Sequence, residues 1–251
     1  MITSAKELFD YSIQALDGEI GSVHDVIFDE NDWSIRYIVV STGVWLLGRK
    51  VLLHPTCIAG PLQTKEQLLP VDLTRAQVKD SPDMAVDLPL SREQEVEYHD
   101  YYRWPYYWGG GVTGAYGVGV APAATIIGDT KLTPEPEIPA DKRDVTLRSA
   151  RDVFGFKVLE AGGDEIGTLL DLGIDLEQAQ VPLLVVKGDL SDEELILAPS
   201  DAAVFGYPEE DLRLALDRRA FEGAPFLKKD DRLTDGLVKA TERHFAGSRI
   251  N

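Results

Sequence analysis

The chain has 251 residues, of which 44% are hydrophobic and 27% charged, as in an ordinary soluble protein of one large or two smaller domains. Its 25 Lys+Arg against 43 Asp+Glu give a formal net charge of −18, which argues against direct binding to nucleic acid or anionic lipid, because both need cationic side chains. A single cysteine, Cys57, excludes an internal disulfide and a thiolate metal cluster.

The first hundred residues show the pattern of short antiparallel strands. In GEIGSVHDVIFDE (18–30), Ile20, Val26 and Phe28 share one face, while Asp25 and Asp29 share the other and are expected to face solvent. Two more apolar runs, IRYIVV and RKVLL, follow after turns. Short strands in a row, without crossover helices between them, predict a small antiparallel barrel or rolled sheet.

Two short helices are predicted after these strands. Thr74 with Gln77, and Ser91 with Gln94, both fit a capping box, in which each side chain satisfies a backbone N–H at the helix start.

The densest aromatic cluster of the chain comes next and leads into a connector rich in Gly and Pro. We call this cluster the aromatic arm; its residues are Tyr98, Tyr101, Tyr102, Trp104, Tyr106, Tyr107 and Trp108. One interpretation is a partner-binding surface, because Tyr and Trp concentrate binding energy at interfaces. The alternatives are an arm that covers its own barrel or staples two barrels together, which we favour because large exposed apolar patches are uncommon, and a homodimer contact.

The strand pattern then returns in the second half. Asp17–Val40 aligns without gaps on Gly163–Val186 at a shift of 146, and the shared residues include the fold-motif positions Glu19, Ile20, Gly21, Asp25 and Asp29, matched by Glu165, Ile166, Gly167, Asp171 and Asp175. The match continues into LTRAQVKDSP and LDRRAFEGAP, and a final helix is predicted after Thr234. We therefore expect a tandem duplication: residues 1–104 and 147–251 as two barrels, each with a terminal helix and its own core, and 105–146 as the linker.

These motifs resemble the PRC-barrel domain family, and the chain looks like a tandem double PRC-barrel protein. The resemblance rests on DGEIGSVHDVIFD, YIVVSTG, GRKVLLHP, LTRAQVKDSP and YHDYYRWPYYWGG. It implies two small β-barrels, similar to the cytoplasmic domain of the photosynthetic reaction-centre H subunit and to a ribosome-maturation factor domain. The family has no shared catalytic motif to carry over. The second unit departs from the pattern where GRKV becomes DEEL.

No catalytic constellation is evident, and we expect no catalytic residue, metal or cofactor. His24 and His54 are matched by Leu170 and Ala198, which favours packing roles, and neither His99 nor His244 has a helix partner at zinc-site spacing. The repeated acids have two interpretations, a pair of carboxylate sites for a cation or a basic partner, and a structural role in turns and at strand edges. The structural role is favoured.

The sequence therefore predicts a non-enzymatic, cytoplasmic protein-interaction module without a transmembrane segment. Its partner is a protein of unknown identity, with a homodimer as the alternative. The resemblance adds two alternatives, a ribosome-assembly factor and a peripheral photosynthetic or membrane-complex protein. The least favoured class is a hydrolase or metal-dependent enzyme that would use Asp25, Asp171 or His24 between the barrels.

Overall fold

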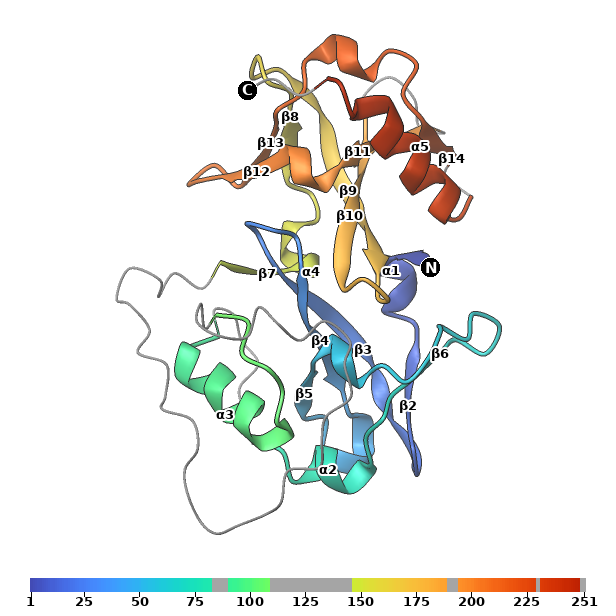
Figure 1. The fold of residues 1–251 in the computed structure, drawn as a ribbon, viewed down its shortest axis with the longest axis vertical. Helices are drawn as coiled ribbons and strands as arrows, with labels where there is room; N and C mark the ends of the chain where they lie inside the picture. Colours follow the sequence, from blue (N-terminus) through green and yellow to red (C-terminus); the bar gives the residue numbers. More distant parts are fainter. Residues whose placement is uncertain (83–89, 109–145, 189–193, 229–230, 249–251) are drawn as a thin grey trace, which may run out of the picture.

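The computed structural model is mainly β, with two mixed sheets and few helices (Figure 1). It describes residues 1–82, 90–108, 146–188, 194–228 and 231–248. We call residues 1–108 the first half and 146–248 the second half.

The first sheet is built on one long strand. This strand is β3 (Gly18–Asp29), and the strand order across the sheet is β5-β4-β3-β2-β6. The remaining strands are β2 (Ser12–Ala15), β4 (Ile35–Ser41), β5 (Lys50–Leu53) and β6 (Leu68–Pro70). Both predicted capping boxes form, and they start α2 (Arg75–Lys79) and α3 (Arg92–Tyr102). Two 3₁₀ turns, η1 (Gly43–Leu46) and η2 (Pro55–Cys57), flank β5.

The second sheet repeats this plan and extends it. Its long strand is β9 (Glu165–Asp175), in the order β12-β13-β8-β9-β10-β11-β14. The other strands are β8 (Lys157–Leu159), β10 (Gln180–Lys187), β11 (Glu194–Pro199), β12 (Ala203–Gly206), β13 (Asp211–Leu214) and β14 (Phe226–Lys228). Thr234 caps α5 (Asp235–Phe245) as predicted, and η4 (Ser200–Ala202) and η5 (Arg218–Phe221) complete the half.

The prediction of two small antiparallel barrels is corrected in two respects. The outer strands β6 and β13 pair in parallel with β2 and β8, so both sheets are mixed. Neither sheet closes, because within the described residues no pairing joins β5 to β6 or β14 to β12.

The two halves exchange their first strands. β1 (Ile2–Ser4) pairs with β9 of the second half, and β7 (Leu147–Ser149) pairs with β3 of the first half. Each strand runs into a one-turn helix, α1 (Ala5–Leu8) or α4 (Ala150–Val153), at the junction between the halves (Figure 1). We call β1–α1 and β7–α4 the exchanged arms.

The tips of the two long hairpins also meet at equivalent residues. Ser34 and Gln180, which the shift of 146 makes equivalent, form a β-bridge. Beside it, the Ile35 N–H donates to the Ala179 carbonyl at 2.8 Å, and the Val181 N–H donates to the Trp33 carbonyl at 2.9 Å. The halves are therefore related by an internal two-fold axis, as two subunits of a symmetric dimer would be.

The core is continuous, which corrects the expectation that each unit buries only its own side chains. The larger cluster of buried residues includes Leu8, Phe28, Val153 and Leu172, which come from both halves and from both exchanged arms. A smaller cluster sits around Leu183 of β10. The exchanged arms explain this continuity, because each carries apolar residues of one half onto the sheet of the other.

Candidate functional site

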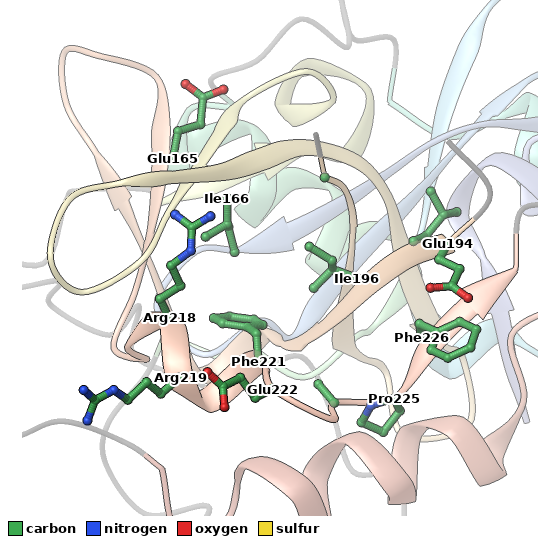
Figure 2. Close-up of a pocket in the computed structure, with 13 residues that line it drawn as sticks. Glu165, Ile166, Glu194, Ile196, Arg218, Arg219, Phe221, Glu222, Pro225 and Phe226 are labelled. Carbon is green, nitrogen blue, oxygen red and sulfur yellow. The ribbon is translucent and has the colours of Figure 1, made fainter. Parts of the chain in front are cut away.

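The second half carries an open pocket of about 640 Å³, within the range of ligand-binding sites. Its wall is made by the start of β9, by β11 and by the segment from η5 to β14 (Figure 2). The apolar lining includes Ile166, Ile196 and Phe221, and the charged groups around it are Glu165, Glu194, Arg218, Arg219 and Glu222. Figure 2 shows the Arg218 side chain rising toward Ile166, whereas Arg219 points away.

A β-bulge shapes the floor of this pocket. The pairing between β8 and β9 shifts register so that Ile166 is the extra residue, and the next residue, Gly167, has φ 153°. A Cβ on Gly167 would overlap the Lys187 carbonyl, so only glycine fits. The first half has the same bulge at Ile20, followed by Gly21 at φ 143°. The repeated motif therefore encodes this local backbone shape twice.

In the first half the equivalent place is filled by Trp45. Its indole Nε1–H donates to the Ile20 carbonyl at 2.7 Å, and the Arg75 guanidinium lies 4.6 Å from its ring. Arg75 corresponds to Arg218 in the repeat alignment. Ile20 is fully buried, whereas Ile166 is only partly buried. The same position is thus closed in one half and open in the other.

The charges at the edge of this position are reversed between the halves. Lys50 and Lys79 of the first half correspond to Glu194 and Glu222 of the second. Glu194 and Glu222 are exposed at the pocket. Glu165 is paired with Lys157 at 2.9 Å. The rim of the open pocket is therefore acidic at two positions where the closed one is basic.

The aromatic arm packs against the first half. Tyr98 and Trp104 are buried, and the ring of Tyr102 stacks on Trp104 with centroids 4.4 Å apart. Tyr106, Tyr107 and Trp108 are partly buried, and Tyr101, at 39%, is the most exposed of the large apolar rings in the arm. This is the arrangement of an arm that covers its own half. Binding of a partner by its partly exposed rings stays a prediction.

A buried polar network anchors the arm. The Glu95 carboxylate is fully buried and accepts hydrogen bonds from the Tyr37 hydroxyl at 2.8 Å, the Tyr107 hydroxyl at 2.6 Å and an Arg92 Nη1–H at 2.6 Å. Burial raises the pKa of Glu95. Burial lowers the pKa of His99, which contacts the Tyr37 hydroxyl at 2.8 Å, to about 4. His99 is therefore neutral near pH 7.

Asp25 and Asp171 hold the exchanged arms, which corrects the expectation that they face solvent. Asp25 accepts from the Ser149 hydroxyl and, at 3.3 Å, from the Arg151 N–H. Asp171 accepts from the Ser4 hydroxyl at 2.7 Å and, at 3.2 Å, from the Lys6 N–H. Both carboxylates are buried because the arm of the other half covers that face of the strand, and this burial raises the pKa of each.

The other repeated acids lie in separate places. Asp29 and Asp175 bond backbone N–H groups in their own hairpin turns, Asn31 N–H at 3.1 Å and Glu177 N–H at 3.0 Å. Glu19 accepts from the Ser12 hydroxyl at 3.1 Å.

The remaining groups singled out in the sequence lie in packed surroundings. His54 is a ring neighbour of Trp104, and burial lowers its pKa to about 4. His244 contacts the Ala220 carbonyl at 2.7 Å. Burial raises the pKa of the Cys57 thiol to about 11. In the described part of the chain, no three His, Cys, Asp or Glu side chains gather in a metal-binding arrangement.

Comparison with known proteins supports the resemblance to the PRC-barrel family for part of the first half of the chain. A family model, PRC-barrel domain, matches residues 4–85, from α1 through the first sheet and past α2. No curated protein matches the chain. No helix among the described residues is long and apolar enough to cross a membrane. PRC-barrel domains are small β domains that often take part in protein interactions, and residues 4–85 carry their sequence pattern.

Proposed function

We propose that the protein is a non-enzymatic interaction module that binds a protein partner through the open pocket of the second half. The observation that carries this proposal is the internal comparison: one chain contains the same shaped position twice, closed by Trp45 in the first half and open over Ile166 in the second. Duplication with one copy left open provides a binding position whose closed form the first half shows.

The titratable groups support a structural rather than a catalytic use. Asp25 and Asp171 hold the exchanged arms, and Glu95 anchors the aromatic arm. Each of these buried carboxylates accepts hydrogen bonds from two or more groups of the protein, so each one holds parts of the fold together.

The charge of the chain favours a basic partner surface. The formal net charge is −18, and Glu194 and Glu222 stand at the edge of the pocket. Complementary charges speed encounter and select partners, and their effect falls as salt increases. Association with the partner is accordingly expected to be faster at low ionic strength.

The test compares the tagged full-length protein with a pocket variant, Ile166→Asp, in affinity capture from a lysate of the source cells. Val204→Asp is the matched control, because Val204 is 67% exposed on β12 and does not line the pocket. Thermal melting first checks that both variants fold. Proteins captured by the wild type and the control but lost with Ile166→Asp support the proposal. An identical set of proteins with all three overturns it.

A further inference from the structure

We propose that the open pocket binds the indole of a tryptophan that the partner protein presents next to basic residues. This inference rests on the proposed function and specifies its anchor residue. Its basis is the chain itself, which shows how this fold holds an indole at the equivalent position of the first half.

The first half provides the pattern of recognition. Trp45 lies at the bulge residue Ile20, to whose carbonyl the indole N–H donates at 2.7 Å. The guanidinium of Arg75 lies over its ring at 4.6 Å, within the distance of a cation–π interaction. A backbone carbonyl and a cation therefore define the indole position. The carbonyl selects for tryptophan among apolar side chains, because the indole N–H is a hydrogen-bond donor.

The second half keeps both of these groups. Ile166 is the extra residue of the same bulge, which takes its carbonyl out of the regular strand pairing. This carbonyl borders the pocket beside Gly188, because a Cβ on Gly188 would lie 3.4 Å from it. Arg218 stands in the place of Arg75, and Figure 2 shows its side chain rising toward Ile166. The acceptor and the cation are thus in place around an open space.

The loop of the second half that aligns with the Trp45 loop contains no tryptophan. Residues 188–194 have the sequence GDLSDEE, which contains no aromatic residue, whereas residues 42–50 have the sequence TGVWLLGRK. The pocket of about 640 Å³ is roomier than one indole requires, so flanking residues of a partner segment also fit.

The rim indicates the charge of these flanking residues. Glu194 replaces Lys50, and Glu222 replaces Lys79, at the edge of the pocket. Acidic groups at these two positions favour Lys or Arg near the tryptophan of the partner.

A second copy of the chain is the competing occupant. Val44 and Leu47 lie on either side of Trp45 and Leu46 in the chain. They are 97% and 98% exposed and form an apolar tip on the first half. That tip presents no indole N–H to the Ile166 carbonyl, because Trp45 is already bonded inside its own half. We therefore commit to the tryptophan of a partner and treat self-association as an outcome of the test.

The experiment uses the full-length protein labelled with ¹⁵N and a capped peptide with the sequence of residues 41–50, STGVWLLGRK, as the probe. The control peptide carries Leu in place of Trp. We expect the Trp peptide to shift the amide resonances of Ile166 and Gly188, and the Leu peptide to bind about tenfold more weakly, because it has neither the N–H nor the indole face. Arg218→Gln should weaken binding of the Trp peptide by about fivefold. Arg243→Gln on α5, where the side chain is exposed and does not line the pocket, should change it by less than about twofold.

Several results would overturn the inference. They are equal binding of the two peptides, equal effects of the two arginine variants, or absence of binding to the wild type. Concentration-dependent self-association by analytical ultracentrifugation that Ile166→Asp removes would assign the pocket to a second copy instead. If Ile166→Asp abolishes partner capture while neither peptide binds, the indole inference is wrong and the proposed interaction function stands. If Ile166→Asp changes neither partner capture nor peptide binding, the indole inference and the proposed function both fail.

Discussion

Replacing Trp45 with alanine should open the first half in the way that the second half is already open. The substitution removes the indole that lies over Ile20, together with its hydrogen bond to the Ile20 carbonyl at 2.7 Å. It also removes the ring that Arg75 covers at 4.6 Å. Ile20 should then become partly exposed, as Ile166 is.

The cost in stability follows from the partial burial of Trp45. A fully buried tryptophan replaced by alanine costs about 3–5 kcal/mol, and a half-buried one with a single hydrogen bond should cost about 2–3 kcal/mol. For a chain of this length, each 1 kcal/mol lowers the melting temperature by about 2–4 °C, so the expected fall is about 4–12 °C.

Two assays follow the Trp45→Ala variant. Calorimetric melting measures the loss of stability, and titration with the tryptophan peptide measures the number of sites, which should increase from one to two. The new site should be the weaker one, because Lys50 and Lys79 occupy the positions that align with Glu194 and Glu222. An unchanged melting temperature together with a single peptide site would refute the equivalence of the two positions.

Three further predictions concern the framework. Gly21→Ala and Gly167→Ala should each cost about 4 kcal/mol or more of folding stability, because a Cβ would overlap a backbone carbonyl at either position. Chemical denaturation would show this cost as a loss of the folded fraction. A mild effect at one site alone would contradict the repeated bulge. The raised pKa values of Asp25 and Asp171 mean that the stabilisation from these two groups is complete at low pH and is lost as pH rises through the folded-state pKa. Urea unfolding should therefore show that the stability of the wild type, relative to that of the double Asn variant, falls as pH rises. A difference that grows with pH would contradict this. Glu95→Ala should cost about 3–5 kcal/mol, because it removes the carboxylate that accepts from the buried Tyr37 hydroxyl, the partly buried Tyr107 hydroxyl and the Arg92 guanidinium. Tryptophan fluorescence should then report an arm that is more accessible to a quencher.

The sequence was sufficient for the features that depend on local pattern. The two capping boxes at Thr74 and Ser91 and the cap at Thr234 form as predicted, because capping needs only residues three positions apart. The bulges at Ile20 and Ile166 also give the same local backbone shape at two positions that the alignment at a shift of 146 makes equivalent.

The exchange of arms could not be predicted in the same way. Ile2–Ser4 and Leu147–Ser149 have the same strand pattern whether they pair with their own half or with the other one. The period of two also placed Asp25 and Asp171 on an open face, since it does not show what covers that face. Burial of both carboxylates follows from partners more than 120 residues away in the sequence.

The open pocket left a signal in the sequence that only the comparison of repeats makes visible. Trp45 lies in a loop whose counterpart has no aromatic residue, while Arg75 keeps its counterpart in Arg218. The aromatic arm is the stronger pattern in the sequence, because seven rings within eleven residues stand out more than one missing ring. In the structure most of the arm is packed against its own half.

The two halves form one unit through the exchanged arms and the paired hairpin tips, with one position left open. A protease site inserted after Gly128 tests it most directly, because cutting there leaves every described contact between the halves intact. After cleavage, the two pieces should sediment as a single particle of unchanged mass until denaturant is added. Separation into two folded monomers under native conditions would contradict the account.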